Sequence, residues 1–311
     1  MDHQMLAQIR ESAINGITKY LGNEKTNEFI LKAEARLEKY AKLWQLSQLC
    51  FMPTETVNLL FECESALYGA CVLKLCIPGP EVATEINCLR AYDGHGYVKL
   101  WDYTLEDDLL LLERVTPGQQ MWAVNDYKER AWLMAHRIKD LHFIHCEQGK
   151  YPTYHIWLTD IHKKLTAMGN MDDMLIYLNK ALHIYDELKQ KYKRSCLLHG
   201  DMHQENMLLN SHGSYTIIDP KGVVDDPVME TARFLMNEVS CDIEKMRAIQ
   251  EMVSIMSPII GIPEADIFKS MYIDAALGQS WTFDEHFPNQ QAYEQSKKEA
   301  LGICEFVHGF L

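Results

Sequence analysis

The stretch LLHGDMHQENMLLNSHGSYTIIDPKG, residues 197–222, sets polar side chains at fixed points around short apolar runs. The runs NMLL and YTII have the length and the apolar character of β-strands. The segment NSHGS separates them, and its central glycine suits a tight turn. The stretch therefore predicts a β-hairpin that follows a loop containing His199 and Asp201.

The expected register of this hairpin brings two oxygen-bearing side chains together at its open end. With the turn centred just before the glycine, Leu209 pairs with Thr216. The same register sets Asn206 opposite Asp219. An amide oxygen and a carboxylate at that separation are ligands that Mg²⁺ accepts, with a substrate phosphate completing the shell. Asp201 enters from the preceding loop, so one carboxylate can receive a proton while the other two groups hold the metal.

The spacing H-x-D-x-x-x-x-N, followed by an aspartate at a strand end, resembles the catalytic segment of the protein-kinase-like fold. In that pattern the loop aspartate, here Asp201, orients and deprotonates the acceptor hydroxyl. The asparagine and the later aspartate, here Asn206 and Asp219, hold Mg²⁺ against the phosphates of the nucleotide. The alternative interpretation is a polar turn whose side chains only cap backbone groups.

A kinase of this type needs further parts upstream, and candidates occur in the expected order. The predicted strand ACVLKL carries Lys74, which would neutralise the α- and β-phosphates of ATP. The predicted helix VATEINCLRAY carries Glu85, which would pair with the lysine. Backbone groups of Glu113 and Val115, after the apolar run LLLL, are the expected adenine contacts. A solvated lysine and a surface glutamate are the alternatives for the first two.

The order of the predicted elements gives a two-lobed α+β architecture. A predicted helix over residues 27–46 precedes TVNLLFEC and GACVLKLC, which read as an antiparallel hairpin. After a turn at Pro117 and Gly118 the pattern is mainly helical. We expect a bilobal protein-kinase-like fold with a small mixed β-sheet N-lobe that binds nucleotide, residues 1–116. The larger, mainly helical C-lobe, residues 117–311, would carry catalysis and substrate binding.

The charge balance narrows the class of partner. The 311 residues include 30 basic and 44 acidic side chains, a formal net charge of −14. Nucleic acid is an unsuitable partner for this chain, because phosphate backbones require basic patches. An acidic cleft would instead concentrate a cationic small molecule, although acidic surfaces also serve solubility alone.

Membrane and export signals are not found in the sequence. No apolar run approaches the roughly 18 residues of a membrane-spanning helix, so we expect no membrane partner. The first residues, MDHQMLAQIRESAING, lack the apolar core of a signal peptide. The nine cysteines form no C-x-x-C pair. Reduced thiols in a cytoplasmic protein are therefore expected.

The motifs LLHGDMHQENML and IIDPKG together resemble the aminoglycoside phosphotransferase superfamily. More narrowly, the chain is similar to the streptomycin 6-kinase and hydroxyurea-resistance kinase family, and RLEKYAKLWQL, ACVLKL and YIDAALGQSWTFDE support this. Protein kinases fit poorly, because Pro-Lys-Gly follows Asp219 and no glycine-rich loop precedes the first strand. Phosphate contacts there would come from backbone N–H groups and from Thr54 or Thr56.

The resemblance implies transfer of the ATP γ-phosphoryl group to a hydroxyl of an aminoglycoside, with Mg²⁺ as the metal. It implies that Asp201 is the catalytic base, that Asn206 and Asp219 bind Mg²⁺, and that Lys74 contacts ATP. An aspartate often begins the helix after DPKG in this family, and here a glutamate stands near that place.

A cationic acceptor rich in hydroxyl groups requires carboxylates and carbonyls in its pocket. The candidate substrate residues in the helical lobe are His203, Asp226, Glu230, Trp281 and Asp284. For the acids the alternative is a solvated surface position, for His203 a role in packing the loop, and for Trp281 a place in the core or pocket wall.

Two other functions stay open from the sequence. The first keeps the fold and changes the acceptor, giving a metabolic kinase of an amino alcohol, an amino acid or a sugar. The second is a nucleotide-binding regulator that has lost turnover. The presence of the base, both metal ligands and the lysine weighs against the regulator.

Overall fold

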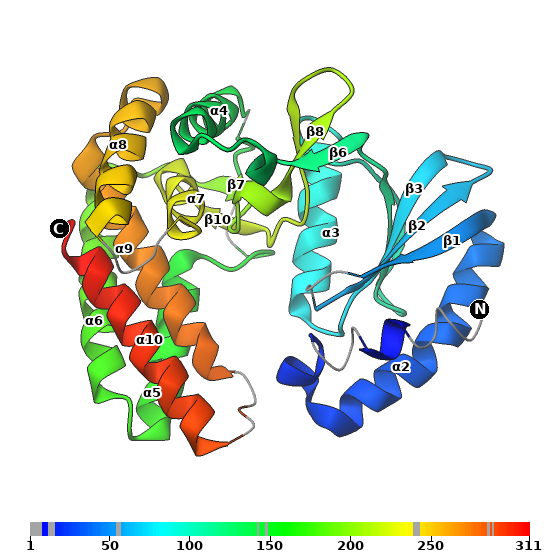
Figure 1. Cartoon of the computed structure of the whole chain (residues 1–311), viewed down its shortest axis with the longest axis horizontal. Coiled ribbons are helices and arrows are strands. Elements are labelled where there is room, and N and C mark those ends of the chain that lie inside the picture. Colours follow the sequence, from blue (N-terminus) through cyan, green and yellow to red (C-terminus); the bar gives the residue numbers. More distant parts are fainter. Residues whose placement is uncertain are drawn as a thin grey trace. The chain divides into compact units, whose positions relative to one another are not determined.

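Contacts within the chain divide it into two compact units. Unit 1 comprises residues 1–116 and 285–287, and unit 2 comprises residues 117–284 and 288–311 (Figure 1). The computed structural model describes residues 8–11, 16–53, 57–141, 143–146, 149–238, 243–284, 287 and 289–311. Nucleotide binding by the first unit and catalysis by the second stay predictions.

Unit 1 contains a five-stranded sheet in the order β1-β2-β3-β5-β4. Each described strand pair is antiparallel, so our expectation of a mixed sheet was wrong in strand direction. Short connections join β1 to β2, β2 to β3 and β4 to β5, and short connections of this kind produce antiparallel neighbours. The elements are α2 (Thr18–Leu43), β1 (Leu46–Met52), β2 (Leu59–Ser65), β3 (Gly69–Leu75), α3 (Pro80–Tyr92), β4 (Leu100–Thr104) and β5 (Leu109–Glu113).

Helix α2 packs against one face of this sheet (Figure 1). The helix begins earlier than the predicted residue 27 and ends at Leu43, just before Gln45 adopts a positive φ of 51°. Alternate residues of β3, including Leu73, belong to the core shared with α2. Lys74 therefore projects from the opposite face of the sheet.

Unit 2 is mainly helical and contains two small antiparallel sheets, β10-β7 and β6-β8-β9. Its helices are α4 (Tyr127–Asp140), α5 (Tyr154–Met168), α6 (Asp172–Lys191), α7 (Ala232–Met236), α8 (Ile243–Ile260), α9 (Glu264–Trp281) and α10 (Gln290–His308). Its strands are β6 (Pro117–Gln120), β7 (Cys196–Leu198), β8 (Met207–Asn210), β9 (Tyr215–Ile217) and β10 (Val223–Asp225). The 3₁₀ turns are η1 (Met121–Ala123), η2 (Gln204–Asn206), η3 (Pro227–Thr231) and η4 (Thr282–Asp284).

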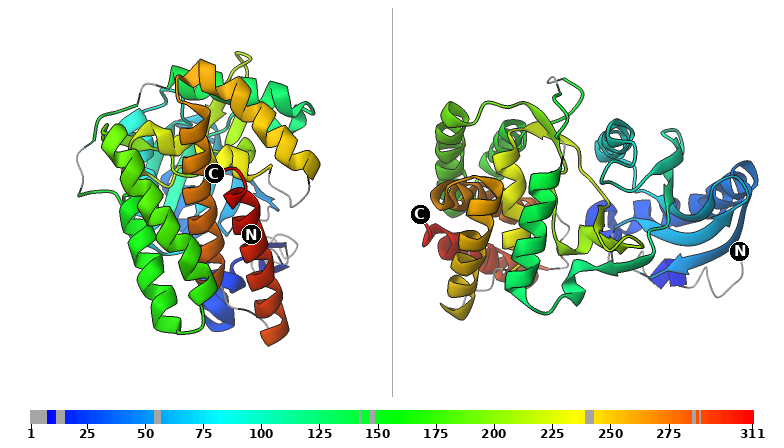
Figure 2. Two further views of the ribbon diagram at one scale, coloured as in Figure 1. Left: turned by 90° about the vertical axis from the view of Figure 1, so that its left-hand side faces the viewer. Right: turned by 90° about the horizontal axis from the view of Figure 1, so that it is seen from above.

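Helix α9 is the central helix of unit 2, and α5, α6 and α10 run beside it (Figures 1 and 2). Its residues 270–277 are all buried, which is expected when neighbours surround a helix on every side. Helix α4 begins after Asp126, which caps it by accepting a hydrogen bond from the N–H of Lys128 at 2.8 Å. The apolar residues Ala131, Met134 and Ile138 of α4 are buried.

The β8–β9 hairpin is shifted by one residue from the predicted register. Leu209 pairs with Tyr215 instead of Thr216. Asn206 consequently lies opposite Ile218, whose N–H donates to the carbonyl of Asn206 at 3.0 Å. Asp219 follows one residue beyond the predicted position, and its positive φ of 58° turns the chain there.

The turn of this hairpin explains the shift. Asn210 donates its N–H to the carbonyl of Ser214 at 2.8 Å, so the turn has a three-residue loop instead of the predicted two-residue loop. The side chain of Asn210 accepts hydrogen bonds from the N–H groups of His212 and Ser214. Gly213 has a φ of +77°, as expected for the last residue of a three-residue hairpin loop.

None of the described helices has both the length and the hydropathy that crossing a membrane requires. Eight cysteines in the described part of the chain are free thiols, and six of them are buried.

Candidate active site

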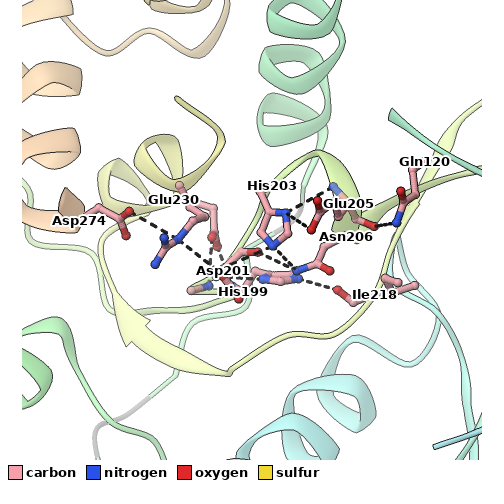
Figure 3. Close-up of polar contacts among 11 residues, drawn as sticks. Gln120, His199, Asp201, His203, Glu205, Asn206, Ile218, Glu230 and Asp274 are labelled. Carbon is pink, nitrogen blue, oxygen red and sulfur yellow. Dashed lines mark hydrogen bonds and ion pairs between the residues drawn. The ribbon is translucent and has the colours of Figure 1, made fainter. Parts of the chain in front are cut away.

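His199 is fully buried just after β7 and fixes the start of the candidate catalytic loop, residues 199–206, called the catalytic loop below. Its Nδ1 accepts the N–H of Asp201 at 3.0 Å, so its Nε2 carries the proton and donates to the carbonyl of Ile218 at 2.8 Å (Figure 3). Burial lowers the pKa of His199 to about 4, which keeps the imidazole neutral at physiological pH. The ring therefore ties the loop to the end of β9 without carrying charge.

Glu230 follows the stretch 197–222 in the sequence, and its side chain holds the same loop. The carboxylate lies in turn η3, is 2% exposed, and accepts the N–H groups of His199 at 2.6 Å and of Gly200 at 3.1 Å (Figure 3). Burial raises its pKa to about 7, although the two backbone hydrogen bonds act in the other direction. Glu230 was predicted to contact substrate, but these bonds direct it to the backbone instead. The longer side chain at this position thus still reaches the loop.

Gly200 is required where the loop turns. Its φ is +78°, and a Cβ at this position would approach the side chain of Val223 to 2.7 Å and that of Trp157 to 3.1 Å. Any other residue would be strained and would push these neighbours away. The loop backbone beside Asp201 is therefore closely packed.

Asn206 is set in place by the loop that contains Asp201, the candidate base. Its side-chain Nδ2 donates to the backbone carbonyl of Asp201 at 3.0 Å (Figure 3), and the residue is 7% exposed. This bond engages the amide nitrogen and leaves Oδ1 as the atom suited to a hard metal ion. The predicted metal ligand and the predicted base are thus brought together.

His203 packs within the catalytic loop. Its Nδ1 accepts the N–H of Glu205 at 3.3 Å, and its Nε2 lies 3.2 Å from Nδ2 of Asn206 (Figure 3). The same Nε2 lies 4.0 Å from Oδ1 of Asp201. Of the two interpretations given to His203, the contacts favour packing of the loop over direct contact with substrate.

Asp219 occupies a conformation that L-residues seldom adopt. Its φ of +58° costs on the order of 1 kcal/mol, although aspartate tolerates this region better than most residues. Non-glycine residues held in this way are often found at functional sites. Asp219 lies two residues after the end of β9, next to Ile218, which is opposite Asn206.

The donor set at Asn206 and Asp219 fits Mg²⁺ and does not fit a softer metal. Both side chains offer oxygen, and Mg²⁺ commonly takes one or two protein oxygens while phosphates and water supply the rest. Within the described residues, no three His, Cys, Asp or Glu side chains are grouped so as to hold a metal ion by themselves. A metal held by Asn206 and Asp219 would take the rest of its coordination from phosphates and water.

Asp201 is partly exposed, and Arg233 contacts its carboxylate. The Nε atom of Arg233 lies 3.1 Å from Oδ1 of Asp201. Burial raises the pKa of Asp201, but the positive charges of Lys221 and Arg233 outweigh it and hold the pKa below its usual value. The carboxylate is thus ionised at neutral pH, as a proton acceptor requires.

The sequence reasoning missed Arg233 and its second partner, Asp274 of α9. The Nε atom of Arg233 lies 3.5 Å from Oδ2 of Asp274, which is 2% exposed. A single arginine in the otherwise apolar run TARFLM was a usable signal, because a buried cation requires a carboxylate partner. The identity of that partner could not be read from the sequence.

A second buried network supports the loop through Gln204, which is fully buried. Its Nε2 donates to Glu238 and to the carbonyl of Phe234, both at 3.1 Å. Glu238 also accepts from Nε of Arg130 at 2.9 Å and from its Nη2 at 2.5 Å. Arg130 in turn donates to the carbonyl of Val124 at 2.7 Å. Helix α4 and the segment before it are thereby tied to the catalytic loop.

In unit 1 the expected lysine–glutamate pair is present. Nζ of Lys74 lies 2.7 Å from Oε1 and 2.8 Å from Oε2 of Glu85, and both side chains are buried. The alternatives of a solvated lysine and a surface glutamate are therefore excluded. Contact of Lys74 with ATP phosphates stays a prediction, and Thr54 and Thr56 lie outside the described residues.

The predicted adenine contacts lie at the end of β5. The N–H of Glu113 donates to the carbonyl of Lys99 at 2.9 Å, within the sheet. The N–H of Glu113 is thus engaged within the protein, and a contact of its carbonyl with adenine stays a prediction. Val115 follows two residues later, after the strand has ended, and its role stays a prediction.

The other predicted substrate residues, Asp226, Trp281 and Asp284, belong to unit 2. Asp226 is 1% exposed and accepts the N–H groups of Val228 and Arg194, so it caps η3 instead of facing a ligand. Trp281 ends α9, and its ring meets the ring of Trp157 edge-on at 5.4 Å. Asp284 ends η4, and its side chain lies outside the described part of the structure.

Comparison with known sequences identifies a matching family and two relatives that are kinases or phosphotransferases. Residues 44–285 match the sequence model of a family described as "Aminoglycoside/hydroxyurea antibiotic resistance kinase". The chain is 21% identical over 295 residues to streptomycin 6-kinase of Streptomyces glaucescens, covering 93% of this chain and 92% of that one. It is 24% identical over 221 residues to hydroxyurea phosphotransferase of Kitasatospora aureofaciens, covering 70% and 64% respectively.

Comparison with solved structures supports the fold. The choline kinase LicA from Streptococcus pneumoniae aligns with a TM-score of 0.63 at 15% identity, over 88% of this chain and 99% of that one. A thermostable mutant of aminoglycoside phosphotransferase APH(4)-Ia, in a ternary complex with ADP and hygromycin B, aligns with a TM-score of 0.59 at 13% identity, over 87% and 97%. The predicted bilobal protein-kinase-like fold is thereby confirmed.

Proposed function

Since the chain belongs to the aminoglycoside/hydroxyurea antibiotic resistance kinase family, we propose that it transfers the γ-phosphoryl group of ATP to a hydroxyl of a streptomycin-like aminoglycoside. The observation that carries this proposal is the arrangement of Asp201 and Asn206 in one braced loop, which sets an ionised carboxylate beside the amide that we propose as a metal ligand. The family match supports the reaction class, and the streptomycin 6-kinase relative supports the acceptor.

In the proposed reaction Asp201 accepts the proton of the acceptor hydroxyl. The hydroxyl oxygen forms a bond to the γ-phosphorus of ATP, and the bond between that phosphorus and the β,γ-bridging oxygen breaks. ADP leaves with the electron pair, and the proton on Asp201 passes to solvent. A pKa below the usual value makes Asp201 a weak base, so its contribution lies mainly in orienting the hydroxyl.

Asn206 and Asp219 would hold Mg²⁺, which, when bound, neutralises the negative charge of the phosphates. The bond from Asn206 to the backbone of Asp201 would keep the metal ligand and the base at a constant spacing. Lys74, extended by Glu85, would supply a further positive charge for the α- and β-phosphates.

Charge supports a cationic acceptor. The net charge of −14 raises the local concentration of cations near the protein. Asp226 and Glu230 accept hydrogen bonds inside the protein, so the selectivity for an amine or guanidine must come from other groups. Trp281, paired with Trp157, stays our candidate for one wall of the acceptor pocket.

Mass spectrometry of an acceptor panel incubated with enzyme and Mg-ATP tests this function. The panel contains streptomycin, hygromycin B, hydroxyurea, choline and ethanolamine, so it also covers the alternative of a metabolic kinase. We expect streptomycin to gain one phosphoryl group. Gain by choline or ethanolamine alone would replace the aminoglycoside acceptor with an amino alcohol.

The variant Asp201→Asn tests the role of the base in the same assay. Transfer should fall by about 10²- to 10⁴-fold while binding of Mg-ATP, measured by calorimetry, stays near the wild-type value. Normal turnover by this variant would remove Asp201 from the mechanism. Binding of ATP by the wild type without transfer to any acceptor would favour the regulator.

A further inference from the structure

The carboxylate of Asp201 is held asymmetrically. Arg233 contacts Oδ1 at 3.1 Å, and the nearest nitrogen of His203 also faces Oδ1, at 4.0 Å (Figure 3). Both contacts thus engage the same oxygen. A base that must accept a hydrogen bond from an acceptor hydroxyl needs its other oxygen presented in a fixed direction.

Arg233 is itself held in place by the helix that carries Trp281. Oδ2 of Asp274 lies 3.5 Å from the Nε atom of Arg233, the same atom that lies 3.1 Å from Oδ1 of Asp201. One turn further along α9, a Cβ at Gly278 would lie 3.4 Å from Nη2 and 3.5 Å from Nη1 of Arg233. The guanidinium therefore lies against the backbone of α9, between two carboxylates.

We propose that Arg233 is a positioning residue for the phosphoryl transfer, fixing Oδ1 of Asp201 so that Oδ2 faces the acceptor hydroxyl. Asp274 holds the guanidinium in this place, and Gly278 leaves room for it. The inference rests on the proposed function of Asp201 as the base. It assigns to α9, through Asp274, a direct influence on the orientation of the catalytic carboxylate.

The test is the kinetics of Arg233→Ala with the acceptor that the panel identifies. A misplaced base costs on the order of 100-fold in rate, so kcat should fall by about that factor while KM for ATP changes little. Removing the side chain leaves a space for a small planar cation, so millimolar methylguanidinium should restore part of kcat. The same concentration of ammonium should restore less, because it cannot lie flat between the two carboxylates.

Two further variants keep the test decisive if Arg233→Ala does not fold. Arg233→Lys keeps the charge but lacks the fork of nitrogens, and Asp274→Asn keeps the volume but weakens the hold on the guanidinium. Both should lower kcat more than they raise KM. The control is Lys191→Ala, which removes another ion pair to α9, with Asp266, and should leave kcat unchanged.

The outcomes separate the two proposals. Wild-type kcat in the Arg233 and Asp274 variants would overturn the inference, and so would a loss of kcat in folded Arg233→Ala that methylguanidinium does not restore. Failure of the proposed function would appear in the wild-type protein, as absence of phosphoryl transfer to the whole panel.

Discussion

His199 and Glu230 should make opposite contributions to the pH dependence of stability. Burial raises the pKa of Glu230 from 4.5 to about 7, so its contribution to stability is full below the unfolded pKa and is lost as pH rises through about 7. Burial lowers the pKa of His199 from 6.5 to about 4. Its contribution is therefore full above pH 6.5 and is lost as pH falls through about 4.

The two effects are of similar size. Each pKa differs by about 2.5 units between the folded and unfolded states, which corresponds to about 3 kcal/mol. Between pH 4.5 and 6.5 the slopes have opposite signs, so the wild type should show little net change from this pair. Glu230→Gln removes one slope, and the free energy of unfolding should then rise by about 3 kcal/mol across that interval.

Urea unfolding, followed by tryptophan fluorescence at several pH values from 4.5 to 7.5, measures this difference. Glu230→Gln should also lose about 1–3 kcal/mol at all pH values, because one backbone N–H loses its acceptor. This loss should lower the stability at pH 4.5 and be offset as the pH approaches 7. The quantity of interest is the change in slope relative to wild type, with the exposed Glu24→Gln as the control. Parallel profiles for wild type and Glu230→Gln would refute the argument.

Three further changes have definite expected outcomes. Lys74→Met leaves Glu85 buried without its cation, so it should lower the free energy of unfolding by about 3–5 kcal/mol in thermal or urea melts and raise KM for ATP. Arg130→Met should lower the free energy of unfolding by a similar amount, and adding Glu238→Leu should recover part of that loss. If the effects of the two substitutions simply added in a double-mutant cycle, the ion pair would be contradicted. Asn206→Ala should raise the Mg²⁺ concentration needed for half-maximal activity, and an unchanged Mg²⁺ titration would remove Asn206 from the metal site.

The parts predicted well from the sequence are those set by local spacing. The H-x-D-x-x-x-x-N motif places Asp201 and Asn206 in one loop whatever the rest of the chain does. The alternation of β3 puts Lys74 on the face opposite Leu73, where it meets a glutamate one helix later. Once a strand lysine is buried with no charged neighbour in sequence, its partner must come from elsewhere in the fold.

The parts predicted poorly depend on side-chain bonds that the pattern does not reveal. The hairpin register shifted because Asn210 closes a three-residue loop with its own carboxamide, while the glycine alone suggested a two-residue turn. Glu230 was assigned to substrate because its position after DPKG is compatible with either role. Its partners, the N–H groups of His199 and Gly200, are 30 or more residues away and emerge only in the folded chain.

The antiparallel pairing of β7 with β10 has a practical consequence for protein engineering. It closes a single segment that contains the candidate base and both candidate metal ligands, and Glu230 lies just beyond its end. Exchange of α5 or α6 with the same helix from a relative would leave intact both that segment and the contact of Asp274 in α9 with Arg233. Chimeras of this kind could therefore map acceptor preference separately from the chemistry, and the tip of the β8–β9 hairpin offers a place for a reporter label.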